Sequence, residues 1–239
     1  MPHLHRFHIE PGSLNAAETA LPPDEMHHAL HVARVRPGEP LALFDGCGHE
    51  WLGRVARTGK HELIAAIEEE RFTPRPAPEI TLLQAWLLRD KAIEFVITHG
   101  VELGLSKLCF FRAARSEREP RGNDKWRRYA IEACKQCGRV WLPDFSVADS
   151  LEEALAQSSG ERLIATRDRA PVAPGAAGGG GDVSVVVGPE GDFTEAELDA
   201  ALGLGAKPVS LGEATFRSEV AAMLLLTLVS SRRGRLGTA

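Results

Sequence analysis

Apolar and polar positions follow two different patterns along this chain, and the first covers about 70 residues. Three short apolar runs, each about the length of a strand, are separated by Asp-Gly and Thr-Gly turns: Leu41–Phe44, Trp51–Val55 and Glu62–Ile67. A helix is expected before them, with Asp24 as its N-cap and Pro37-Gly38 as its end. Short strands joined by tight turns predict a small antiparallel β-barrel.

The second pattern begins after three prolines in six residues, at 73–78. Such a segment stiffens a connection and cannot lie inside a sheet. We therefore predict a domain boundary here, with a first domain of residues 1–72 and a second of residues 73–239.

Strands and helices alternate in the second domain. The predicted strands are Ile80–Trp86, Leu108–Phe111, Leu163–Thr166, Val183–Val187 and Val209–Leu211. The predicted helices are Ala92–Leu103, Lys125–Cys137, Glu195–Leu202 and Val220–Ser231. This alternation predicts an α/β fold, a parallel sheet with helices on both faces. Ligands of such sheets bind at the carboxyl ends of the strands.

Two of these strand ends have the composition of a ligand site. Val187 is followed by Gly188-Pro189-Glu190-Gly191 and then by Thr194 and Glu197, which are spaced as a capping box. Leu211-Gly212 is followed by Arg217 and Glu219, directly before a nearly all-apolar helix. We expect these two charges to lie near the interior, where they need a partner or a ligand.

One segment of the chain differs in charge from the whole. The 239-residue chain has a net charge of −5, yet Arg112 to Arg139 contains nine Lys and Arg against four acids. Such a basic segment is typical of a surface that follows nucleic-acid phosphates. A solvated helix face is the alternative interpretation.

The remaining composition argues for a globular protein of the cytoplasm. Apolar residues make up 44% of the chain, without a run long enough to span a membrane, and the N-terminus lacks a secretory signal. The four cysteines are too few for a disulfide scaffold, and Cys134-x-x-Cys137 falls inside a predicted helix. His27 and His31 lack further ligands, so we expect no metal.

At this point the sequence resembles a known family, the RsmE-type methyltransferases of small-subunit ribosomal RNA. In the first domain the resemblance rests on His5-Arg6-Phe7, on 28–39 and on Leu43-Phe44-Asp45-Gly46. In the second it rests on Glu102-Leu103-Gly104, Arg115-Ser116, 126–139, Gly188-Pro189-Glu190-Gly191, and Leu211-Gly212 with Arg217, Glu219 and Ala221. It covers nearly the whole chain.

The resemblance implies a PUA-like β-barrel followed by a SPOUT domain with a C-terminal trefoil knot. It implies a homodimer that uses S-adenosylmethionine to methylate N3 of a uridine in 16S ribosomal RNA of the small ribosomal subunit. Arg217 and Glu219 are the catalytic candidates. The cofactor candidates are Thr166, Val187, Gly188, Pro189, Glu190, Gly191, Leu211, Gly212, Thr215, Phe216 and Arg217. The RNA-binding candidates are Arg6, Arg34, Arg115, Arg121, Arg127, Arg128 and Arg139.

Two departures from the family pattern concern these motifs. Val220 stands where the family has Thr, and Asp192 stands where it has Gly. Two other functions stay open: an RNA-binding protein without catalysis, and a related knotted ribose 2′-O-methyltransferase. Cofactor binding distinguishes the first, and nucleoside analysis of the product distinguishes the second.

Overall fold

The computed structural model describes residues 4–14, 17–59, 62–166 and 180–236. The chain forms two compact units. The first comprises Met1–Arg75 together with Ile131–Leu142, and the second comprises Pro76–Ala130 together with Pro143–Ala239. We predicted a single division, between residues 72 and 73. The contacts instead group 131–142 with the first unit.

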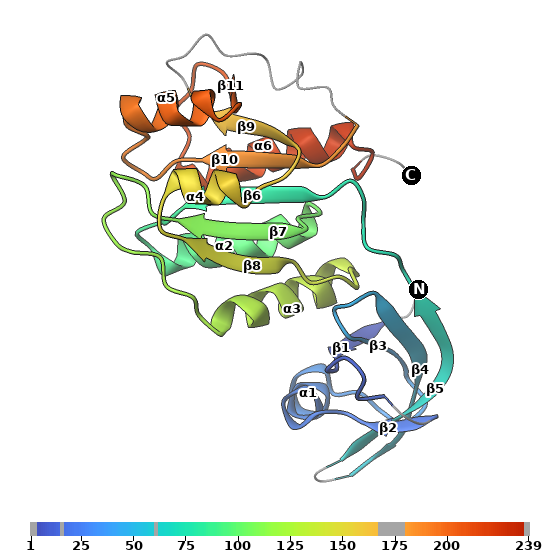
Figure 1. Cartoon of the computed structure of the whole chain (residues 1–239). Coiled ribbons are helices and arrows are strands. Elements are labelled where there is room, and N and C mark those ends of the chain that lie inside the picture. The colour runs from blue at the N-terminus through green and yellow to red at the C-terminus, as the bar shows by residue number, and fades with distance from the viewer. Residues whose placement is uncertain (1–3, 15–16, 60–61, 167–179, 237–239) are drawn as a thin grey trace. The chain divides into compact units, whose positions relative to one another are not determined.

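The first unit contains a five-stranded sheet in the order β1-β3-β4-β5-β2 (Figure 1). Its strands are β1 (His5–His8), β2 (Glu18–Ala20), β3 (Pro40–Phe44), β4 (His49–Thr58) and β5 (Leu63–Phe72). β1 runs parallel to β3, and the other pairs are antiparallel. The three predicted strands are present, and β4 and β5 are longer than predicted. β1 and β2 were not predicted.

The predicted helix of this unit differs at both ends. Helix α1 (Pro23–His27) has Pro22 as its N-cap and continues as a π-helix, η1 (His28–Ala33). Asp24 therefore lies in the first turn, where its charge complements the helix dipole, and is not the N-cap. The helix ends before Pro37-Gly38 because Arg34 adopts a left-handed conformation, with φ of 55°.

The second unit contains a six-stranded sheet in the order β11-β9-β10-β6-β7-β8. Its strands are β6 (Ile80–Ala85), β7 (Lys107–Phe111), β8 (Asp144–Ala148), β9 (Glu161–Ala165), β10 (Val183–Val187) and β11 (Lys207–Val209). Every pair in this sheet is parallel, which confirms the predicted architecture. β11 ends two residues earlier than predicted, and β8 was not predicted.

Five helices accompany this sheet (Figure 1). They are α2 (Asp90–Glu102), α3 (Lys125–Cys137), α4 (Leu151–Ala156), α5 (Glu195–Gly203) and α6 (Ser218–Arg232). α4 and α5 pack together on one face, and α2 and α6 pack together on the other. Successive residues of β6 serve the two faces, because Leu83 and Ala85 join the core under α4 and α5 while Gln84 bonds to Ser218 of α6.

We find no helix in the described part of the chain with the length and apolar content that crossing a membrane requires.

Candidate active site

The parallel strands β9, β10 and β11 end side by side and surround a cavity of about 360 Å³. We call it the strand-end cavity. Its walls come from the three strand ends, the loops that follow β10 and β11, and the start of α6. The lining residues are Ala165, Thr166, Val187, Gly188, Pro189, Glu190, Asp192, Val209, Leu211, Gly212, Ala214, Thr215, Phe216, Arg217, Ser218 and Ala221.

Ten of the eleven predicted cofactor residues line this cavity, and Gly191 does not. The carbonyl of Gly191 instead accepts a hydrogen bond from Arg115 Nη1 at 3.0 Å. A Cβ at this position would lie 3.2 Å from Cβ of Arg115, which explains why a glycine suits it. Gly191 therefore contacts Arg115 and not the cavity, and this contact helps to hold the loop after β10.

Hydrogen bonds on both sides hold the loop after β10. The Gly188 carbonyl accepts from the hydroxyl of Ser218, and that hydroxyl in turn accepts from Gln84 Nε2 at 2.8 Å. Glu190 Oε1 accepts from the backbone N–H of Leu88 at 3.1 Å. The loop is thus fixed before any ligand arrives, and preorganised polar groups bind without a further ordering cost.

Asp192, the carboxylate that replaces the family's glycine, has φ of 62°. Aspartate is one of the few residues that adopts this left-handed conformation readily. Its Oδ1 accepts from the N–H of Phe193 at 2.8 Å, so the substitution keeps the turn. The capping box predicted after it, between Thr194 and Glu197, is confirmed.

Arg217 is the N-cap residue of α6 and lines the mouth of the cavity. We expected both charges near the interior, and this is wrong for Arg217, whose side chain is exposed. The helix that follows is buried only from Ser218 onward, so a position one residue earlier reaches solvent. Within the described residues the Arg217 side chain makes no hydrogen bond or ion pair, while its backbone carbonyl accepts from the N–H groups of Val220 and Ala221. Glu219 is half-buried and does not line the cavity.

The predicted RNA-binding arginines fall into two groups. Arg6 is buried in an ion pair with Glu50, over the Phe44 ring, and Arg115 donates to the carbonyls of Gly191 and Phe193. These two side chains are engaged within the protein. Exposure does not separate the two groups, because Arg115 is itself exposed; Arg34, Arg121, Arg127 and Arg128 are also exposed, and Arg139 is half-buried.

Lys135 shows that part of the basic segment has a structural role. Its ammonium contacts Glu25 at 2.6 Å and Glu132 at 2.8 Å, and only 10% of the side chain is exposed. Burial raises the pKa of Glu25, and the Lys135 hydrogen bond and charge oppose that shift. Lys135 therefore holds residues 131–142 to helix α1 within the first unit.

Neither a metal centre nor a thiol site is evident here. No group of three or more potential ligands occurs in the described residues, where His27 and His31 only stack on each other. All four cysteines are free, and burial raises the pKa of the Cys134 thiol to about 12. At neutral pH that thiol is protonated and unreactive.

The sequence placed the Asp192 carboxylate beside the cofactor loop, but it missed other residues of the cavity, among them Ser218 as the link between α6 and the loop after β10. A small hydroxyl at a helix start has several ordinary roles, so pattern alone could not assign it. Ala214 and Ala221 carry no chemical signal at all.

The protein families and the curated relatives that match this chain are RNA methyltransferases. Residues 73–230 match the family described as "RNA methyltransferase domain", and residues 21–68 match "RNA methyltransferase PUA domain". A curated relative from Mycobacterium bovis, named "Ribosomal RNA small subunit methyltransferase E", is 28% identical over 236 residues, covering 93% of this chain and 90% of the relative.

Solved structures agree. A ribosomal RNA small subunit methyltransferase E from Neisseria gonorrhoeae, bound to S-adenosyl methionine, is 30% identical, with a TM-score of 0.83 over 96% of this chain and 98% of that one. A putative methyltransferase from Legionella pneumophila, with bound SAM, is 25% identical, with a TM-score of 0.85 over the same shares. The family match spans well over half of the sequence, and the chain belongs to the RNA methyltransferase domain family, with an RNA methyltransferase PUA domain at its N-terminal end.

Proposed function

We propose that this protein transfers a methyl group from S-adenosylmethionine to N3 of a uridine in 16S ribosomal RNA of the small subunit. The observation that carries the proposal is the strand-end cavity, where the ends of three parallel strands and the loops after β10 and β11 meet the exposed cation Arg217. Relatives named small subunit methyltransferase E, and two similar structures that hold the cofactor, support it.

The residues present fit this cofactor. A volume of about 360 Å³ lies within the range of small-molecule sites, about 300–1,000 Å³. Val187, Leu211 and Phe216 offer apolar surface to an adenine ring, and the backbone of the loops after β10 and β11 offers hydrogen bonds. Gly212, with φ of 107°, needs a conformation that side chains rarely allow.

The chemistry assigned to this chain concerns the proton and charge on the base. Bound S-adenosylmethionine supplies an electrophilic methyl group. Uracil N3 carries a proton at neutral pH, and its loss spreads negative charge over N3 and both carbonyl oxygens. In the proposal Arg217, exposed at the cavity mouth, stabilises that charge. The role of Glu219 as proton acceptor stays a prediction, and its position outside the cavity lining gives it no support.

Two further parts of the proposal concern assembly and topology. We propose a homodimer in which a second copy covers the α2–α6 face, where Phe95 is 38% and Leu228 is 40% exposed. Light scattering at micromolar concentration should give the dimer mass. The C-terminal trefoil knot stays a prediction from the family resemblance.

Product analysis tests the function. Labelled S-adenosylmethionine is incubated with the protein and either isolated 16S ribosomal RNA or assembled small subunits, and the nucleosides are identified by mass spectrometry. We expect 3-methyluridine from one of the two substrates. A methyl group on a ribose 2′ oxygen would assign the other knotted activity. Binding of RNA without affinity for the cofactor would leave only the non-catalytic function.

A further inference from the structure

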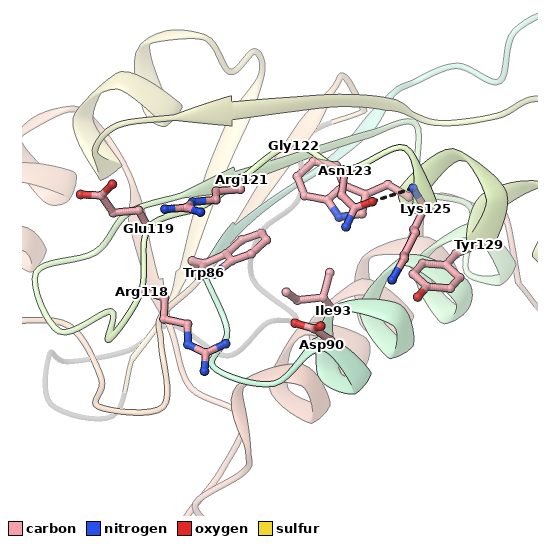
Figure 2. A pocket seen from close by; sticks show the side chains of 11 residues that line it. Trp86, Asp90, Ile93, Arg118, Glu119, Arg121, Gly122, Asn123, Lys125 and Tyr129 are labelled. Atoms are coloured by element: carbon pink, nitrogen blue, oxygen red, sulfur yellow. Dashed lines mark hydrogen bonds between the residues drawn. The ribbon is translucent and has the colours of Figure 1, made fainter.

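A second cavity of about 650 Å³ lies in the same unit, at the carboxyl ends of β6 and β7 (Figure 2). We call it the tryptophan cavity. It shares no lining residue with the strand-end cavity. It is lined by residues directly after β6, at the start of α2, and from the loop before α3 into its first turns: Trp86, Asp90, Ile93, Arg118, Glu119, Arg121, Gly122, Asn123, Lys125, Trp126 and Tyr129.

Trp86 presents an aromatic surface whose position is fixed. Its ring is half-buried, and it packs edge-on against Phe110 at 5.2 Å and at a tilt of 45° against Trp126 at 6.0 Å between ring centroids. Phe110 and Trp126 are themselves buried. Two buried rings therefore hold the indole while part of it stays open to the hollow.

Three cations surround this ring: Arg118, Arg121 and Lys125 (Figure 2). All three are exposed. Of the two acids in the lining, Glu119 is already paired with Arg112 at 2.8 Å. In a chain with a net charge of −5, a hollow that combines exposed cations with an aromatic platform favours an anionic ligand that carries a flat ring. Single-stranded nucleic acid is recognised by this combination of base stacking and backbone contacts to cations.

The segment that carries Trp86 also contacts the strand-end cavity. Gln84, two residues earlier, bonds to Ser218, and the N–H of Leu88, two residues later, bonds to Glu190. Two residues of extended chain span at most about 7 Å. A base on Trp86 would therefore lie close to the proposed methyl-transfer site without entering it.

We propose that the tryptophan cavity binds an unpaired nucleotide of the RNA that flanks the methylated one, with its base stacked on Trp86 and its phosphate held by Arg118, Arg121 and Lys125. This rests on the proposed function. Asp90 and Asn123 lie in the same lining and offer polar contacts to the edge of the base. The cavity then selects a single-stranded stretch, since the bases of a duplex are already stacked and paired.

The test measures binding of fluorescently labelled hexauridylate by anisotropy. Trp86→Ala should weaken binding about tenfold or more, because stacking on an aromatic side chain contributes strongly to each bound base. Trp86→Phe keeps a flat ring and should stay within about threefold of wild type. A blunt RNA duplex without unpaired nucleotides should bind both variants and wild type alike.

Trp86→Ala could fail to fold, because the Trp86 ring packs on two other rings. A second variant therefore tests the cavity without changing that packing. Arg121→Ala removes an exposed side chain and should lower the salt slope of hexauridylate binding by about one phosphate contact. The matched control is Lys207→Ala, an exposed cation at the amino end of β11 and so at the opposite edge of the sheet. It should leave the slope unchanged.

Two outcomes separate this proposal from the proposed function. If wild type produces no methylated nucleoside but hexauridylate binding depends on Trp86, the proposal for the tryptophan cavity is supported and the proposed methyl transfer is contradicted. If wild type methylates RNA while a folded Trp86→Ala and Arg121→Ala both bind hexauridylate as wild type does, the cavity proposal is overturned. Unchanged affinity for S-adenosylmethionine shows that each variant is folded.

Discussion

The two cavities of the second unit lie at one edge of one sheet, yet different kinds of residue line them. The strand-end cavity is formed largely by loop backbone and small or apolar side chains, with Arg217 at its mouth. The tryptophan cavity is formed by long charged and aromatic side chains. Fixed backbone suits a small cofactor of constant shape, whereas long cations suit a charged polymer that is held at several points.

The basic segment divides in the same way. Arg121, Arg127 and Arg128 are exposed, while Arg115 supports the loop after β10 and Lys135 lies in an ion-pair cluster of the first unit. Position along the chain therefore does not decide which cations face RNA. Three predictions test this division of roles, from the largest expected effect to the smallest.

Loss of Arg217 should have the largest effect on the reaction. Arg217→Ala should reduce methyl transfer by about 10²–10³-fold, because a preorganised cation at developing charge contributes on that scale. The fold should persist, since the side chain is exposed and makes no described contact. Single-turnover kinetics measure the rate, and Arg217→Lys serves as the charge-conserving control. Turnover near the wild-type value in the alanine variant would remove Arg217 from the mechanism.

The exposed arginines should govern the dependence of RNA binding on salt. Replacing Arg121, Arg127 and Arg128 with Ala should flatten the log–log salt slope by up to about three contacts, at about 0.7–0.9 per contact. Affinity for S-adenosylmethionine should not change. Titrations of RNA at several salt concentrations give the slope. If the triple variant keeps it, this surface is only solvated, and RNA recognition moves to the first unit.

Loss of Arg115 should change cofactor binding and not RNA binding, although the resemblance placed this residue among the RNA-binding residues. Arg115→Ala removes two hydrogen bonds to the backbone around Gly191 and should weaken cofactor binding by about three- to tenfold. The salt slope of RNA binding should stay as in wild type. Calorimetry with S-adenosylmethionine, beside the same RNA titration, separates the two effects. A flattened slope with unchanged cofactor affinity would return Arg115 to the RNA surface.

The fold was predictable where the local pattern and the burial agree. Lys125–Cys137 and Val183–Val187 have the predicted bounds, since one is strongly amphipathic and the other is buried throughout, with four valines among its five residues. Asp144–Ala148 was missed because only one of its five residues is buried, as is common for a strand at a sheet edge. Leu151–Ala156 was missed because six residues show too little periodicity.

The strand-end cavity was largely predictable, and the tryptophan cavity was not. Gly188 directly follows β10, and Gly212 lies three residues after the end of β11, so a rule about strand ends finds both. Trp86 and Asp90 come from one segment and Arg121 from another, and only the tertiary fold brings the two together. The exposure of Arg217 and the burial of Lys135 likewise depend on packing that neighbouring residues do not reveal.

The most direct test of the division between the cavities is calorimetric titration of S-adenosylmethionine into wild type and two tryptophan variants. Ala214 is exposed and lines the strand-end cavity, so Ala214→Trp should fill that cavity without disturbing the core. Ala156, at the exposed end of α4, lies outside both cavities and gives the matched control, Ala156→Trp. We predict that wild type and Ala156→Trp bind the cofactor equally and that Ala214→Trp loses binding by about 100-fold or more. Equal affinity in all three proteins would contradict the assignment of the strand-end cavity to the cofactor.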